Sequence, residues 1–268
     1  MILYFHMFLL PCLMAEFHQT RKLFYRGGIS ERTLIMNECL LLISIPVMYG
    51  ALLLTYRLFG TKGLTPFLVF ATVLANIEVL ILVKAFGIEM TLGNILFATT
   101  FVVTDILSEN VGKQAAKQAV NIGIFLSILF VVVSQSWFLY MPSVNDWAST
   151  SIRTLFANTP RLILVSMAVY ALVQRFDVWL YHTIWSATEK KYGDRRKGLW
   201  LRNNAATMAS QLLNAVLYNI GAFWGIYSTE TLMQIIISTF AIYVVTSLCD
   251  TPVVYLARRM REKGMIPN

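Results

Sequence analysis

Seven stretches of this 268-residue sequence, each about 20 residues long, are almost free of charged side chains. A helix needs about that many apolar residues to cross a membrane. Charged residues make up only 13% of the chain, about half of the share typical of soluble domains, so lipid is the expected solvent. The stretches cover residues 39–56, 64–86, 91–109, 118–140, 162–186, 203–227 and 231–257. Because no strand alternation is visible, the sequence predicts an all-α polytopic membrane bundle of about seven transmembrane helices.

This composition excludes a soluble enzyme, a secreted disulfide scaffold and a disordered chain. Metal sites and disulfides need ligands at characteristic spacings, and the cysteines and histidines of this chain are isolated from one another. We therefore expect no metal and no cofactor. The residues concerned are Cys12, Cys39, Cys249, His6, His18 and His182.

The positive charge of the chain lies in its loops and predicts its orientation in the cytoplasmic membrane. The net charge is +8, and basic residues gather in the 189–202 loop and in the tail after residue 257. Basic loops stay on the cytoplasmic side, so these two segments and the C-terminus are expected there. The 141–160 loop and the N-terminus then lie outside. The charge is explained by orientation and by anionic lipid, so no direct binding of nucleic acid is expected.

Residues 1–35 conflict with that orientation, because four basic residues would lie outside: Arg21, Lys22, Arg26 and Arg32. One interpretation is an additional interfacial helix. We favour the hypothesis that translation begins at Met36, since the codons of Glu31 and Arg32 can resemble a ribosome-binding site. The expected organisation is then an N-terminal extension (1–35), an additional N-terminal transmembrane helix (36–60), a core of six helices (64–260) and a cytoplasmic tail (261–268).

A polar face repeats on the fifth and sixth predicted helices. On both helices the polar positions follow steps of four, four, three and four residues, and the two sets are offset by 37 residues throughout. The sets are Ser166, Tyr170, Gln174, Asp177 and Tyr181, and Asn203, Thr207, Gln211, Asn214 and Tyr218. The seventh helix continues the pattern less cleanly, with Thr239, Tyr243, Ser247, Asp250 and a displaced Tyr255. Such faces point into a bundle interior or a water-filled cavity, and repeats of this kind are common in transporters. General hydrogen bonding between helices is the alternative.

Charged residues also mark the third and fifth helices. Asp105 and Glu109 are four residues apart and share one helix face, so one of the two carboxylates could carry a proton. Glu109 alternatively lies at a solvated helix end or pairs with lysines. Arg161 follows Pro160 at the start of the fifth helix, where the helix dipole disfavours a cation. An ion pair with Asp105 or Asp177, or anchoring at the membrane interface, would explain it.

Several of these segments together resemble the queuosine precursor transporter family, also called the putative vitamin uptake (VUT) family. The similar segments are Thr91-Leu-Gly-Asn94 through Thr104-Asp105-Ile-Leu-Ser-Glu109-Asn-Val-Gly112, the helix from Arg161 to Asp177, the helix from Asn203 to Asn214, and Asp250-Thr-Pro252. Asn214 departs from the family pattern, which more usually has an aspartate there. The resemblance covers roughly residues 64–260 and places the 39–56 helix before a core of six helices.

The resemblance implies a transporter, not an enzyme, that imports 7-deazaguanine precursors of queuosine such as preQ0, preQ1 or queuine. A carboxylate would accept from the N–H edge of the base, amides would add contacts, and Tyr170, Tyr181 or Tyr218 would stack on the ring. The alternative is a substrate-binding membrane subunit driven by a separate ATPase. The sequence does not decide whether the chain forms a homo-oligomer. The candidate substrate-binding residues are Asp105, Glu109, Arg161, Ser166, Tyr170, Gln174, Asp177, Asn203, Gln211, Asn214 and Asp250.

Overall fold

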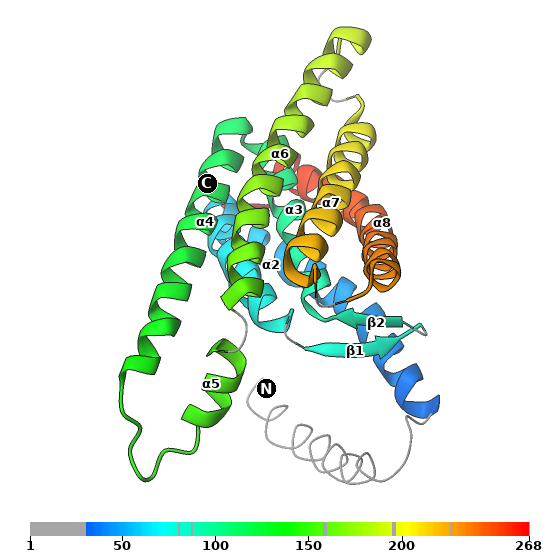
Figure 1. Cartoon of the computed structure of the whole chain (residues 1–268). Helices are drawn as coiled ribbons and strands as arrows, with labels where there is room; N and C mark the ends of the chain where they lie inside the picture. The colour runs from blue at the N-terminus through cyan, green and yellow to red at the C-terminus, as the bar shows by residue number, and fades with distance from the viewer. Residues whose placement is uncertain are drawn as a thin grey trace.

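The structure is a computed structural model that describes residues 31–79, 81–86, 88–157, 160–194, 197–225 and 227–267. The predictions made for residues 1–30 lie outside this range. Helices account for nearly all of the described chain, as Figure 1 shows, and a short hairpin and a few loops complete it. The prediction of a helical bundle is therefore confirmed.

The first described helix, α2, runs from Glu31 to Glu78 and is broken at Gly60. Gly60 has φ 61° and ψ −152°, a backbone conformation that is essentially restricted to glycine. The break divides α2 into two antiparallel segments, which correspond to the first two predicted transmembrane helices. The carbonyl of Pro267, close to the C-terminus, lies so near Gly60 that a Cβ atom there would come within 2.5 Å of it. The turn and the end of the chain are thus packed together.

The second predicted helix is shorter than expected, and this part of the prediction is wrong. It ends at Glu78 and not near residue 86, and two antiparallel strands follow, β1 (Leu82–Ala85) and β2 (Ile88–Thr91). Each strand has only four residues, LVKA and IEMT, and one charged residue, so neither shows a clear alternation that would have predicted it from the sequence. The N–H of Phe86 donates to Glu38 Oε1 at 2.8 Å, which connects the hairpin to the start of α2.

The rest of the described chain is a sequence of helices joined by short loops. Its elements are α3 (Gly93–Asn110), α4 (Lys113–Ser136), η1 (Trp137–Leu139), α5 (Ser149–Ala157), α6 (Pro160–Tyr192), α7 (Leu199–Phe223) and α8 (Thr229–Glu262). Asp146 precedes α5 and accepts hydrogen bonds from the Ser149 hydroxyl and from the N–H groups of Ser149 and Ala148. These hydrogen bonds, the one from the Ser149 hydroxyl above all, hold the pKa of the Asp146 carboxyl below its usual range.

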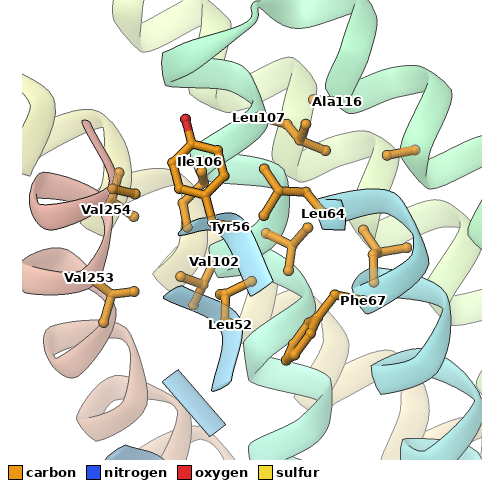
Figure 2. Packing of buried hydrophobic residues seen from close by; sticks show 14 of the residues in the cluster. Leu52, Tyr56, Leu64, Phe67, Val102, Ile106, Leu107, Ala116, Val253 and Val254 are labelled. Atoms are coloured by element: carbon orange, nitrogen blue, oxygen red, sulfur yellow. The ribbon is translucent and has the colours of Figure 1, made fainter. Parts of the chain in front are cut away.

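Helix α3 lies at the centre of the bundle and is buried along almost its entire length. One side of α3 packs against the two segments of α2, α4 and α8 in an apolar cluster, shown in Figure 2. Its members include Leu52, Tyr56, Leu64, Phe67, Val102, Ile106, Leu107, Ala116, Val253 and Val254. Because α3 contacts most other helices, the residues on the side of α3 opposite this cluster lie in the most enclosed part of the bundle.

The outer surface of the bundle is apolar. Large hydrophobic side chains are exposed along α2, α4 and α8, among them Ile43, Val47, Phe125, Val132, Ile237 and Val245. Among the described residues, three helical segments are long and apolar enough to cross a membrane: Met36–Glu78, Lys113–Leu139 and Leu232–Glu262. An apolar exterior around a partly polar interior is the arrangement expected in lipid.

Replacing Gly93 with alanine is expected to destabilise the contact between α2 and α3. An added Cβ would lie 2.7 Å from the carbonyl oxygen of Ala75 and 2.9 Å from the amide nitrogen of Val79, and neither backbone atom can rotate away. Overpacking of this kind typically costs about 1–3 kcal/mol. Gly50→Ala is the matched control, because a Cβ at Gly50 meets nothing within 4 Å and alanine favours helix. Thermal unfolding in detergent should show a lower Tm for Gly93→Ala alone, and equal Tm values would contradict this packing.

Candidate functional site

Polar residues of α3, α6, α7 and α8 lie in the interior of the bundle, buried except for the half-buried Asn94 and Ser166, and follow its axis. We call this set the polar column. It consists of Asn94, Thr100, Asp105 and Glu109 of α3, Ser166, Tyr170, Gln174, Asp177 and Tyr181 of α6, Asn203, Thr207, Gln211 and Asn214 of α7, and Tyr243, Ser247 and Asp250 of α8. Along α3 the column extends about 22 Å, from the hairpin end of the bundle to the opposite end. The repeated faces of α6 and α7 thus both contribute to one interior.

The hairpin end of the column contains a small cavity surrounded by aromatic and amide side chains. Asn214 Nδ2 donates to the Tyr243 hydroxyl at 3.0 Å, and this hydroxyl donates to Asn94 Oδ1 at 3.3 Å. The cavity has a volume of about 40 Å³, which is enough for about one water molecule. Its lining consists of Thr72, Ala75, Asn76, Val79, Gly93, Asn94, Phe97, Ser166, Tyr170, Asn214, Tyr218 and Tyr243.

On the side of this cavity that faces away from the hairpin, the column contains buried hydrogen-bonding atoms that have no partner in the described structure. Gln174 Nε2 donates to Thr100 Oγ1 at 2.5 Å, whereas Gln174 Oε1 accepts no hydrogen bond. The side-chain amide of Gln211 makes no hydrogen bond from either of its polar atoms, and the hydroxyl of Ser247 makes none. A buried polar group without a partner costs about 1–3 kcal/mol, so this level of the column is suited to a polar ligand.

Three carboxyl groups come next along the column, one from each of three helices. Asp105 of α3, Asp177 of α6 and Asp250 of α8 are all at most 1% exposed, and they lie close enough for their charges to interact. Asp105 Oδ2 accepts from the Thr207 hydroxyl at 3.2 Å, and the Tyr49 hydroxyl donates to Asp250 Oδ1. Neither oxygen of Asp177 has a partner at full hydrogen-bonding geometry among the described residues, and the Ser210 hydroxyl is the donor that lies beside this carboxylate.

A buried group of ion pairs occupies the end of the column opposite the hairpin, which we call the arginine end. Glu109 Oε2 accepts from Arg202 Nη2 at 2.5 Å and from the Tyr181 hydroxyl at 3.2 Å, and Glu109 Oε1 lies 3.1 Å from Arg258 Nη1. The guanidinium carbon of Arg202 lies 4.2 Å from the ring centre of Trp185, in cation–π contact. These contacts join α3, α6, α7 and α8 and close the column at this end.

Comparison with known proteins shows to which family this chain belongs. Residues 91–257 match the family described as "Putative vitamin uptake transporter", which is more than half of the chain. The chain belongs to this transporter family. It is also 37% identical, over 216 residues, to the "Probable queuosine precursor transporter" of Bacillus subtilis (strain 168), covering 81% of this chain and 90% of that protein. No solved structure matches. The transporter is therefore a multi-pass membrane protein, in agreement with its apolar helices.

The structure of the transporter brings together ten of the eleven candidate residues predicted from the sequence. Glu109 lies in the column together with Asp105. It pairs with Arg202 and Arg258, whereas the alternative prediction was a solvated helix end or pairing with lysines. Asn203 donates from Nδ2 to the Thr251 hydroxyl at 3.3 Å, on the side of the column facing α8. Tyr255, the displaced position of the repeat, is exposed and lies outside the column.

Arg161 is the exception, because the expected ion pair with Asp105 or Asp177 does not form. Its guanidinium instead donates to the backbone carbonyls of Gly221 and Trp224 at 2.8 and 2.9 Å. Both carbonyls belong to the C-terminal end of α7, where helix carbonyls lack intrahelical donors and the helix dipole favours a cation. Arg161 therefore caps a neighbouring helix of the transporter.

Sequence reasoning missed two residues that hold the column together. Arg202 belongs to the basic 189–202 loop that the sequence predicts to be cytoplasmic, yet its side chain is fully buried. Tyr49 lies in the segment expected to precede the core, and its contact with Asp250 connects that segment to the interior. Tyr49 is one of four hydroxyl-bearing residues in the 39–56 run, and nothing in the sequence singles it out or identifies a partner 201 positions away.

Proposed function

We propose that the transporter imports queuosine precursors, 7-deazaguanine bases such as preQ0, preQ1 or queuine, for salvage into tRNA queuosine. The name of the Bacillus subtilis relative supports this substrate class. The chemistry of the column supports it independently. One edge of a guanine-like base has a ring N–H and an exocyclic amino group beside a carbonyl oxygen. A protein that binds this edge must present hydrogen-bond acceptors to the two donors and a donor to the carbonyl.

The observation that carries the proposal is a group of unpartnered atoms on adjacent helices. Asp177 has two free carboxylate oxygens, Gln211 a free amide, and Gln174 a free carbonyl oxygen, counted over the described residues. In the proposed complex the carboxylate of Asp177 accepts from the ring N–H and the exocyclic amino group. The amide nitrogen of Gln211 donates to the carbonyl of the base. Recognition of this kind discriminates strongly against bases that lack the donors, because buried partners would remain unpaired.

The aromatic lining of the cavity supports a planar substrate. Four aromatic side chains line the cavity, which adjoins the unpartnered atoms on the hairpin side: Phe97, Tyr170, Tyr218 and Tyr243. Aromatic rings bind bases by stacking, which contributes about 1–3 kcal/mol per base. With a volume of about 40 Å³ the cavity is smaller than a base, so the side chains that line it must move apart to admit the substrate.

We propose the same membrane orientation as the basic loops predict, with the arginine end in the cytoplasm. The turn at Gly60, the end of α3, the start of α7 and the C-terminal tail all lie at this end. A surface pocket of about 350 Å³ opens there beside the ion pairs, and Ser108, Trp185 and Arg258 are among its lining residues. Substrate would enter at the hairpin end and leave through this pocket. The proposed core covers residues 64–260, with 36–60 as the preceding helix.

The proposal is tested in bacteria that cannot synthesise preQ0 and lack their own importer. Expression of the chain should restore queuosine in tRNA at low external concentrations of at least one of preQ0, preQ1 and queuine, detected by boronate gel shift. Thr183→Ala, an exposed position on the same helix as Asp177, should restore it equally. Confirmed membrane expression without restoration by any of the three bases would overturn the proposal. Uptake by the purified chain alone in liposomes distinguishes it from a subunit that needs a separate ATPase.

A further inference from the structure

Two of the three buried carboxyl groups are not required by the proposed contact with the base, on which this inference rests. Asp105 and Asp250 each have one oxygen in a hydrogen bond and one oxygen, Oδ1 and Oδ2 respectively, without a partner among the described residues. The fully buried hydroxyl of Ser247, one turn before Asp250, also has no partner among the described residues. The interior thus offers more hydrogen-bonding capacity at this level than a base alone would use.

The charge at this level is not compensated by any cation in the described chain. The nearest buried cation along the column is Arg202, whose guanidinium binds Glu109 and the carbonyl of Lys197. Three ionised carboxylates enclosed in a membrane would each carry a desolvation penalty of several kcal/mol and would repel one another. The titratable groups close enough to interact with Asp105 or Asp250 are Tyr49 of α2, Glu109 of α3, Asp177 and Tyr181 of α6, and the exposed Cys249 of α8. Arg202 of α7 lies beyond Tyr181, over the face of its ring.

A proton fits this site better than a metal ion. Metal cations are held by several oxygen or nitrogen ligands at once, at fixed short distances. The described residues contain no group of three or more His, Cys, Asp or Glu side chains arranged to hold one. A proton needs only one carboxylate oxygen, and the two unpartnered oxygens of Asp105 and Asp250 provide such positions.

We propose that Asp105 and Asp250 form a proton-binding site that couples import of the base to the entry of one proton. A proton from the outer side forms an O–H bond with a carboxylate oxygen of this pair. That bond breaks when the arginine end opens, and the proton is released into the cytoplasm as the base leaves. The Tyr49 hydroxyl, which donates to Asp250, is a positioning group that orients this carboxylate. The base itself crosses without a change in charge.

The test uses the purified full chain in liposomes with labelled preQ0, a neutral base, and the membrane potential clamped at zero. Two measurements separate coupling from binding: accumulation driven by an acidic exterior, and exchange of internal for external base at equal pH. Coupling to one proton gives at most about tenfold accumulation per pH unit, since one pH unit and a tenfold concentration ratio are equal in free energy. The unaltered chain should accumulate preQ0 toward this limit, and a protonophore should abolish the accumulation.

Asp105→Asn and Asp250→Asn replace a protonatable oxygen with an amide and imitate the neutral form. Each should abolish accumulation driven by the pH gradient and reduce exchange by a much smaller factor, whereas the control Thr183→Ala should match the unaltered chain in both. Tyr49→Phe, which keeps the ring, should shift the pH profile of uptake without removing exchange. Accumulation that does not depend on the pH gradient, or that depends on a sodium gradient, would overturn proton coupling. If the unaltered chain exchanges the base but does not accumulate it in response to an acidic exterior, this inference alone is refuted. If the unaltered chain does not exchange the base at all, the proposed function is refuted as well.

Discussion

Uptake of 7-deazaguanine bases is expected to fall by roughly 30- to 1,000-fold when Asp177 is replaced with asparagine. The substitution keeps the size of the side chain but presents an N–H group to the donors of the base, where the structure has two free carboxylate oxygens. Losing charged hydrogen bonds and leaving donors unpaired costs about 2–4 kcal/mol, which corresponds to that range. Uptake of labelled preQ0 and preQ1 in cells measures it directly, with membrane expression quantified in parallel.

Gln211→Ala extends this prediction to the facing helix. It removes an amide whose two polar atoms have no partner in the described chain, so it should weaken uptake while leaving the folded protein intact. Leu212→Ala is the matched control, because the neighbouring side chain is 44% exposed on the outside of the bundle. If Asp177→Asn and Gln211→Ala both transport at the level of the unaltered chain, the column does not bind the base at this position.

The second large effect concerns stability and the Glu109 ion pairs. Glu109→Gln removes the negative charge that faces the fully buried Arg202 and the 15% exposed Arg258. Removing one partner of a buried pair leaves an uncompensated charge and typically costs about 3–5 kcal/mol. We therefore expect Glu109→Gln to lower the Tm in detergent by several degrees or to prevent accumulation of folded protein.

Glu262→Gln provides the comparison for that measurement. Glu262 also contacts Arg258, at 3.3 Å, but its side chain is 46% exposed and solvent already screens the interaction. Exposed pairs of this kind contribute about 0–1 kcal/mol, so its Tm should stay close to that of the unaltered chain. A similar Tm for both variants would mean that the Glu109 cluster does not stabilise the bundle.

Much of the polar column could be predicted because it depends on helical periodicity alone. Residues at steps of three and four lie on one face of a helix, and polar faces in lipid turn inward, so Gln174, Asp177, Gln211 and Asn214 follow from spacing. The contacts between helices do not follow in this way. Nothing in the spacing of α6 or α7 indicates that Gln174 meets Thr100 while Gln211 meets no partner.

The features that the sequence did not reveal depend on packing between distant segments. Arg161 donates to a carbonyl 60 residues later at the end of α7, and Arg202, from the basic loop, pairs with Glu109. In both cases the charge was evident but its partner was not, because long side chains reach carbonyls or carboxylates in any direction. The hairpin after Glu78 was missed for a different reason, since two four-residue strands are too short to show a period clearly.

The packing of the C-terminal tail has a practical consequence for studying the protein. Gly264 turns the chain back after α8, Ile266 packs against the apolar cluster, and Pro267 lies on the turn at Gly60. An affinity tag or fluorescent reporter inserted directly after Pro267 would therefore begin against the folded bundle, and its linker would compete with these contacts. The exposed loop at 141–147 is a better place for an epitope, and antibody binding to it in intact cells would also reveal which end of the bundle faces outward.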